Sequence, residues 1–240
     1  MEFQKIKDIL LSVLFTKRCR FCERVTDIRK EVCEKCKNEI FAIDGDICLK
    51  CGCKKSDCTC NNKARYYMSV CAPYYYDGAV KKAIGLLKFH NNKNMAETLA
   101  KDMAKTFNER YDELDFDICT FVPAHKKELK KRGYNQAQLI AENLSKEIDV
   151  PFVEILEKNF ETEPQHSLNQ SMRSGNLLGA IGLKEKIKTD ITGKRILICD
   201  DVKTTGSTLD ECAKTLLING AAEVRCIAAC IAKNNSTQKN

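Results

Sequence analysis

Residues 196–208 read Ile-Leu-Ile-Cys-Asp-Asp-Val-Lys-Thr-Thr-Gly-Ser-Thr. The apolar run 196–199 predicts a short parallel strand, buried on both faces, that stops at two carboxylates. A loop of hydroxyl side chains around one glycine follows. Beyond residue 208, apolar residues recur at the spacing of an amphipathic helix, namely Leu209, Cys212, Ala213, Leu216 and Leu217. The stretch therefore predicts a strand, a loop and a helix in immediate succession.

The residue types of this loop indicate a site for a ribose 5-phosphate. A helix N-terminus offers free N–H groups to an anion, and hydroxyls and a glycine add donors and room. Asp200 and Asp201 suit a vicinal diol, like the acidic residue of dinucleotide sites. A capped surface turn uses similar residues, but the coincidence of strand, acids, loop and helix favours a binding site. The predicted phosphate ligands are Thr204, Thr205, Gly206, Ser207 and Thr208.

Residues 200–208 resemble the phosphoribosyl-pyrophosphate (PRPP) motif of type I phosphoribosyltransferases. The resemblance implies that Asp200 and Asp201 hold the ribose hydroxyls and that the loop 204–208 holds the 5-phosphate. Members that act on 6-oxopurines carry an aspartate, a proposed base, where this chain has Thr204. A 6-oxopurine substrate is therefore not expected.

The chain has fifteen cysteines, and nine of them lie between residues 19 and 60. Paired thiolates two residues apart can supply four sulfur ligands to Zn²⁺. This segment has few large apolar residues, so metal would replace a hydrophobic core. We predict two structural zinc sites in series, with the ligands Cys19, Cys22, Cys33, Cys36 and Cys48, Cys51, Cys58, Cys60.

Several features of the cysteine segment stay open at this level. Cys53 is a spare thiol that could displace Cys51, Cys58 or Cys60, and the spacing also allows an interleaved pairing. An iron–sulfur cluster or redox thiols are the alternatives to zinc. A site of four thiolates leaves no position for water, which argues against zinc catalysis. The six later cysteines are predicted to be buried small hydrophobes: Cys71, Cys119, Cys199, Cys212, Cys226 and Cys230.

Composition sets the broad class of the protein. The 240 residues, 43% of them hydrophobic, suffice for one α/β domain and a small module. A net charge of +7 suits a polyanionic ligand or nucleic acid without choosing between them. Residues 1–15 have helical amphipathic spacing, and their longest apolar run is too short to span a membrane. Without a recognisable signal peptide, we expect reduced thiols and a cytoplasmic location.

Helices and apolar strands alternate in the remainder of the chain. Strands are expected within 66–76, 117–122, 153–156 and 223–232, and helices at 79–87, 95–111 and 136–148. This order predicts a parallel sheet with helices on both faces, and ligands beyond the carboxyl ends of its strands. The predicted divisions are an N-terminal helix (1–17), a cysteine module (18–62), the α/β domain (63–233) and a polar tail (234–240).

A basic run follows the strand expected at 117–122. By itself such a run is typical of a solvated helix face. In type I phosphoribosyltransferases, however, a loop in this place binds pyrophosphate. The resemblance therefore implies a pyrophosphate loop made by Pro123, Ala124 and His125, followed by a mobile basic lid. In that lid, Lys126, Lys127 and Arg132 would neutralise the leaving group.

Residues 132–137, Arg-Gly-Tyr-Asn-Gln-Ala, resemble the Arg-Gly-Phe-Asn-Gln-Ala signature of ComF-type proteins. Residues 87–89, Leu-Lys-Phe, and scattered positions in 165–180 match further motifs of that family. The resemblance covers nearly the whole chain. It implies a double zinc ribbon followed by a type I phosphoribosyltransferase-like parallel sheet with helices on both faces. The implied ligand is PRPP or a related ribose phosphate with Mg²⁺.

The resemblance also implies a link to natural competence and the uptake of transforming DNA. One reading is a phosphoribosyltransferase of unknown acceptor, whose acceptor contacts would come from residues 65–92 and 159–182. The alternative is a non-catalytic protein that binds single-stranded DNA, or an adaptor for competence proteins, with the PRPP site as a sensor.

Overall fold

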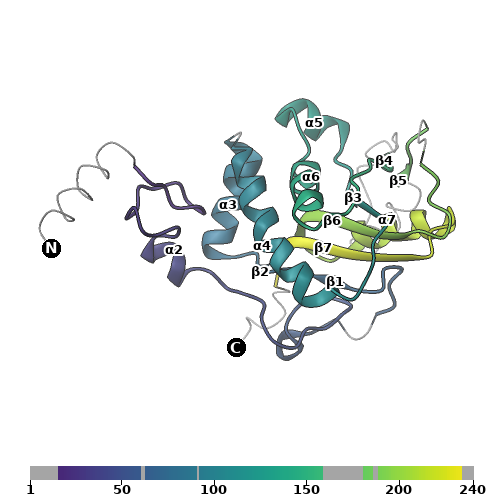
Figure 1. Cartoon of the computed structure of the whole chain (residues 1–240), viewed down its shortest axis with the longest axis horizontal. Coiled ribbons are helices and arrows are strands. Elements are labelled where there is room, and N and C mark those ends of the chain that lie inside the picture. The colour runs from purple at the N-terminus through teal and green to yellow at the C-terminus, as the bar shows by residue number, and fades with distance from the viewer. Residues whose placement is uncertain (1–15, 61–62, 91, 159–180, 186–188, 234–240) are drawn as a thin grey trace, which may run out of the picture.

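A parallel sheet forms the centre of the computed structural model, which describes residues 16–60, 63–90, 92–158, 181–185 and 189–233. Its strands lie in the order β1 (Val70–Cys71), β7 (Glu223–Ile231), β6 (Arg195–Lys203) and β3 (Ile118–Phe121), and β2 (Tyr74–Tyr75) also pairs with β7. All these pairings are parallel. The predicted helix at 1–15 and the matched positions in 165–180 lie outside the described residues (Figure 1).

The central strand is longer than predicted. β6 continues through both carboxylates, because β7 pairs with it along that length, with Asp200 opposite Ala228 and Lys203 opposite Ile231. The helix expected after residue 208 is α7 (Ser207–Ile218), and it begins inside the hydroxyl loop. The expectation that the strand stops at residue 199 was therefore wrong. A carboxylate ends an apolar pattern, but it does not end backbone pairing.

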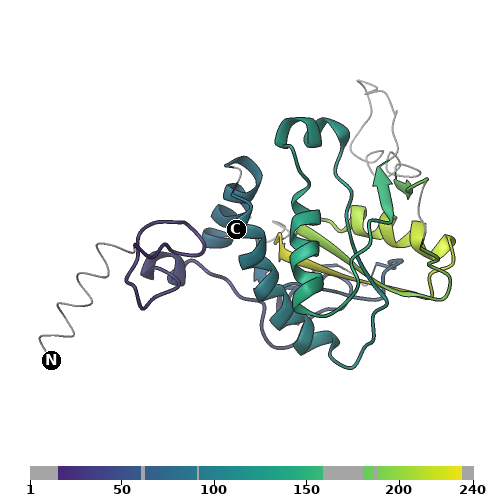
Figure 2. The same ribbon diagram turned by 45° about the horizontal axis from the view of Figure 1, so that its top comes forward.

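Helices cover both faces of the sheet, as predicted (Figures 1 and 2). Three helices, α3 (Gly78–Phe89), α4 (Asn94–Tyr111) and α6 (Gln136–Glu147), share one hydrophobic core with Leu197 and Cys199. On the other face α7 shares a second core with Ile196 and Ile198. Successive residues of β6 thus enter opposite cores, as alternating side chains of a strand must. This arrangement fixes the carboxyl ends of β6 and β3 on one edge of the molecule.

The strand expected at 153–156 forms later and elsewhere. Strands β4 (Leu156–Lys158) and β5 (Ile181–Leu183) form a separate antiparallel pair. The chain touches the main sheet only briefly before this, through a bridge between Phe152 and Cys119. The six later cysteines are all buried, as predicted. No helix among the described residues is long and apolar enough to cross a membrane.

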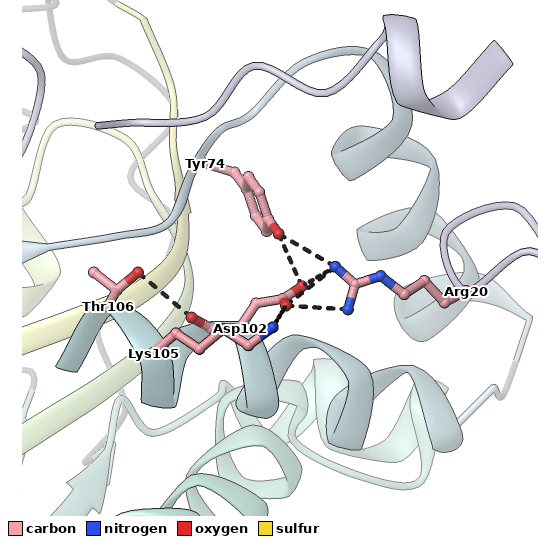
Figure 3. Close-up of polar contacts among 5 residues, drawn as sticks. All are labelled: Arg20, Tyr74, Asp102, Lys105 and Thr106. Atoms are coloured by element: carbon pink, nitrogen blue, oxygen red, sulfur yellow. Dashed lines mark hydrogen bonds and ion pairs between the residues drawn. The ribbon is translucent and has the colours of Figure 1, made fainter. Parts of the chain in front are cut away.

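The cysteine module contains α2 (Glu34–Asn38) and a single 3-10 turn (Lys55–Asp57), and its first half packs on α4. Arg20 forms an ion pair with Asp102 at 2.9 Å, and the Tyr74 hydroxyl donates to the same carboxylate at 2.9 Å (Figure 3). Asp102 is only 3% exposed. A buried carboxylate needs such partners, so this contact positions the module on the α/β domain.

The second half of the module packs on the sheet itself. Gly52 has φ +76°, and a Cβ there would lie 2.5 Å from Ile231 Cδ1 and 3.0 Å from the Val70 carbonyl oxygen. Only glycine fits that approach. The Tyr67 hydroxyl donates to the Lys50 carbonyl at 2.9 Å. The module therefore packs against the edge of the sheet at which β6 and β7 end.

Candidate functional site

The acid pair lies near the carboxyl end of β6, inside the strand rather than just beyond it as the sequence predicted. The backbone N–H of Asp201 donates to Asp200 Oδ1 at 2.8 Å, and that of Val202 donates to Asp201 Oδ1 at 2.9 Å. Burial, followed by the neighbouring charge of Asp201, raises the pKa of Asp200 well above its ordinary value. Two close carboxylates in this setting favour a cation or hydroxyl donors beside them.

A lysine that the sequence reasoning did not assign to the site contacts this pair. Lys88 Nζ lies 2.5 Å from Asp201 Oδ2, and the two side chains are 21% and 13% exposed. Burial opposes the charge of the ammonium, but Asp201 and then Asp200 outweigh that effect, so the pKa of Lys88 is raised. In the sequence, Lys88 stands out only as a member of the Leu-Lys-Phe motif, and that motif does not indicate what the lysine does.

The hydroxyl loop joins β6 to α7 in the geometry of an anion cradle. Gly206, with φ +79°, is the N-cap of α7, and Ser207 begins the helix. The Thr205 and Ser207 hydroxyls lie 3.0 Å apart, and the Ser207 N–H donates to Thr205 Oγ1 at 3.3 Å. Such a loop presents hydroxyls and free backbone N–H groups to one point. The five predicted loop residues, 204–208, therefore lie together where β6 meets α7.

The back of this loop is held by the segment that follows the cysteine module. Arg65 Nη2 donates to the Thr205 carbonyl at 2.7 Å, and the Tyr66 N–H donates to Asp210 of α7 at 2.6 Å. A Cβ on Gly206 would lie 3.0 Å from the Tyr67 hydroxyl oxygen and 3.1 Å from Lys203 Cε. The left-handed turn and these neighbours together require glycine.

The predicted pyrophosphate loop follows β3, next to the end of β6. The Val122 N–H donates to the Cys199 carbonyl at 3.0 Å, which keeps residues 123–125 beside the acid pair's strand. The basic run is a capped helix, α5 (Lys126–Arg132), begun by His125 and ended by Gly133 in the left-handed conformation. His125 Nδ1 accepts the Lys127 N–H at 3.0 Å. Lys126 and Lys127 themselves are exposed.

The ComF-like signature explains how these parts are joined. Asn135 donates to the Val122 carbonyl at 2.9 Å and accepts the Ala137 N–H at 3.0 Å, so it caps α6 and fixes the end of β3. The Tyr134 hydroxyl donates to the Leu87 carbonyl. The Arg132 guanidinium lies 5.6 Å from the centre of the Phe89 ring. The signature thus ties the pyrophosphate loop to the helix that carries Lys88.

The structure brings some predicted residues together more closely than others. The acid pair, the loop 204–208 and the loop 123–125 lie on one edge of the sheet, at the ends of the neighbouring strands β6 and β3. Arg132 contacts Gln136 at 3.2 Å and reaches Phe89 of α3. Lys126 and Lys127 point to solvent, so their role remains a prediction. Of the two expected acceptor segments, residues 159–180 lie outside the described part of the chain.

The predicted cysteine ligands form two sets of four. Within each set the sulfur atoms lie within 4.8 Å of one another, and the sets are Cys19, Cys22, Cys33, Cys36 and Cys48, Cys51, Cys58, Cys60. The pairing is therefore sequential rather than interleaved, and Cys53 lies outside both sets. Backbone N–H groups of Cys33 and Cys36 donate to sulfur at 3.4 and 3.5 Å. Four converging thiols fit a tetrahedral zinc ion.

Similar proteins support this reading of the chain. A family model described as "Phosphoribosyl transferase domain" matches residues 129–240. Competence protein ComFC of Bacillus subtilis (strain 168) is 26% identical over 203 residues, which cover 80% of each chain. Competence protein F of Haemophilus influenzae is 28% identical over 230 residues, covering 88% of this chain and 95% of that one. Together these similarities support a ComF-family protein.

A third relative is not named as a competence protein. The DNA utilization protein YhgH of Escherichia coli (strain K12) is 28% identical over 216 residues, covering 88% of this chain and 89% of that one. Each of these relatives aligns with four fifths or more of this chain. The predicted fold, a type I phosphoribosyltransferase-like sheet behind a cysteine module that fits a zinc ribbon, is thereby confirmed.

Proposed function

We propose that this ComF-family protein binds PRPP or a related ribose 5-phosphate, with Mg²⁺, at the end of β6. The observation that carries the proposal is the placement of two carboxylates directly before a hydroxyl loop and a helix start. Asp200 and Asp201 would accept hydrogen bonds from the ribose hydroxyls. The loop 204–208 would donate backbone and hydroxyl hydrogens to the 5-phosphate. Lys88 supports the proposal, because its ammonium forms an ion pair with Asp201 and so places a cation beside the acid pair.

The neighbouring loop suits the pyrophosphate end of such a ligand. Residues 123–125 leave β3 beside β6, and Arg132 lies against α3 near Lys88. When bound, Mg²⁺ would neutralise the phosphate oxygens of PRPP. If transfer occurs, Arg132 and the cations of α5 would stabilise the departing pyrophosphate as its charge develops.

The biological setting that we propose is natural competence, in the handling of transforming DNA. The names of the relatives support this link: two are competence proteins and one is a DNA utilization protein. The cysteine module would serve this protein structurally, as two zinc ribbons that hold the edge of the sheet beside the loop 204–208.

Calorimetric titration of PRPP in the presence of Mg²⁺ tests the proposed ligand. We expect binding by the natural protein and at least a tenfold loss in Asp201→Asn, because hydrogen bonds to a charged group contribute about 1.5–3 kcal/mol. Asp115→Asn is the matched control, since Asp115 is exposed and pairs with Arg195 at the opposite end of β6. Equal affinity in Asp201→Asn and the natural protein would contradict the proposal.

A further inference from the structure

A cavity of about 700 Å³ lies between the second cysteine set and the loop that follows β6. It lies on the β7 side of β6, because its walls include Ala232 and Lys233 beyond β7 and no residue of the loop 123–132. It shares only Thr204 and Thr205 with the proposed ribose phosphate site. Sites for small organic molecules have volumes of about 300–1,000 Å³. The cavity is therefore far larger than a single inorganic ion requires.

The walls of this cavity are predominantly cationic. Four of the lining residues are cations, and one is a carboxylate: Lys63, Arg65, Lys203, Lys233 and Asp57. Two of the cations have acidic partners, since Arg65 lies 3.5 Å from Asp210 and Lys233 lies 3.9 Å from Asp57. The remainder of the wall includes thiols and an alanine methyl group. A cationic lining suits an acidic group, and Cys53 and Ala232 offer apolar contacts to a small carbon skeleton.

Lys203 is the buried member of this group. It is 4% exposed, and its Nζ has the Thr204 carbonyl as a hydrogen-bond partner at 3.4 Å. Among the described residues no carboxylate forms an ion pair with it. An ammonium buried without a counter-charge is costly. The counter-charge is either a bound anion or the thiolates of the adjacent cysteine set, and these two explanations predict different mutant behaviour.

We propose that the cavity binds a small organic acid, with Lys203 at its base and Lys63 and Lys233 at its rim. The acidic group, a carboxylate or a phosphate monoester, would meet Lys203, and the carbon skeleton would lie against Cys53 and Ala232. The cysteine module would thus form one wall of a ligand site. This site adjoins the proposed ribose phosphate site and shares Thr204 and Thr205 with it, but acid binding at Lys203 does not depend on the function proposed above.

Fluorine NMR of small probes tests this site. The probes are 4-fluorobenzoate, 4-fluorophenyl phosphate and the uncharged 4-fluorobenzamide, each added to zinc-loaded protein that is saturated with ribose 5-phosphate. We expect line broadening for at least one acid and none for the amide. Lys203→Met should weaken acid binding at least tenfold, because charged hydrogen bonds contribute about 1.5–3 kcal/mol. Lys233→Met should weaken it less, and Lys146→Met, on the exposed face of α6, should have no effect.

Each other result overturns the proposal. If the amide signal broadens as much as the acid signals, the site does not recognise the negative charge. If neither acid signal broadens, the cavity does not bind such acids. Loss of zinc in Lys203→Met, with acid binding unchanged in Lys233→Met, assigns Lys203 to the thiolates instead. A separate titration with ribose 5-phosphate alone reports on the proposed function. If that titration fails, the benzoate arm still decides the acid site, because benzoate carries no phosphate for the loop 204–208.

Discussion

At the scale of single residues, the contact between Lys88 and Asp201 connects two motifs that are more than a hundred positions apart. Asp200 and Asp201 are adjacent carboxyl groups, both only partly exposed, and such a pair without a nearby cation is costly. Lys88 lies on the other side of the pair and reaches it from the last turn of α3. The Leu-Lys-Phe motif therefore has a physical role in this fold: it supplies a cation to the acid pair of the proposed ribose site.

Replacement of Lys88 should destabilise the fold. Lys88→Met leaves Asp201 without its cation, and removing one partner of a buried ion pair typically costs about 3–5 kcal/mol. Because both side chains retain some exposure, we expect a loss of about 2–3 kcal/mol in the free energy of unfolding by urea at pH 8. Lys81→Met is the control, since Lys81 is exposed on the same helix. Equal unfolding curves for the two variants would show that the ion pair of Lys88 with Asp201 does not stabilise the fold.

The raised pKa of Asp200 predicts a pH-dependent stability. The folded protein holds this proton more tightly than the unfolded chain, so stability falls as pH rises from the ordinary pKa of 3.8 through the raised value. Asp200→Asn removes that penalty. We expect it to raise the free energy of unfolding at pH 8, because the buried carboxylate no longer has to be charged in the folded protein. The gain should be smaller at pH 5; a loss of stability at pH 8 would show that the acid is not strained.

At the scale of elements, the turn between β6 and α7 determines the shape of the phosphate loop. Gly206 is in the left-handed conformation, and its missing side chain leaves room for Tyr67 and Lys203. Tyr67 also contacts the cysteine module through the Lys50 carbonyl, and Lys203 lines the proposed acid cavity. A change in this turn therefore affects the loop and the segment that holds it from behind.

Gly206→Ala tests whether the loop geometry matters for binding. A left-handed alanine costs roughly 1 kcal/mol by itself, and the added Cβ also meets the Tyr67 hydroxyl. Gly193→Ala is a matched control, because Gly193 has φ +70° and nothing lies within 4 Å of its Cβ position. Both variants should lose stability, measured by thermal unfolding. Only Gly206→Ala should also lose affinity for ribose 5-phosphate, and a parallel loss in Gly193→Ala would argue against the loop assignment.

At the scale of the whole molecule, the cysteine module is anchored at two places, on α4 through Asp102 and on the sheet through Gly52. Asp102→Asn should destabilise the protein by about 3 kcal/mol, because it leaves Arg20 partly buried without its carboxylate. Urea unfolding measures this loss. Glu97→Gln, which breaks an exposed pair with Lys101 on the same helix, should change stability little. Similar effects in both variants would mean that the buried pair does not hold the module.

Metal content tests the role of the two cysteine sets. Four thiolates bind one zinc ion, so two sets predict about two equivalents of zinc per chain. Chelation should lower the melting temperature, because metal binding contributes to the folding of such modules. Cys53→Ser should retain both ions, since Cys53 lies outside the sets. Retention of one equivalent, or loss on Cys53→Ser, would change the ligand assignment.

Much of this architecture could be predicted from the sequence, because it depends on local patterns. The helices, the acid pair at the end of a strand and the cysteine sets all follow from spacing between near neighbours. The ends of the elements were harder to predict. β6 continues past Asp200 because it pairs with β7, and residues 196–208 alone do not encode that pairing. The contact of Lys88 with Asp201 depends on how α3 packs across the sheet. The cationic cavity depends on where the cysteine module docks.

The most direct test of the central claim is a crystal structure with ribose 5-phosphate and Mg²⁺. The account predicts the phosphate within hydrogen-bond distance of the backbone N–H groups of residues 206–208. It also predicts the ribose hydroxyls at Asp200 and Asp201, with Lys88 retained or displaced towards solvent. A sugar phosphate bound elsewhere, or turned so that its phosphate meets the carboxylates, would contradict the account.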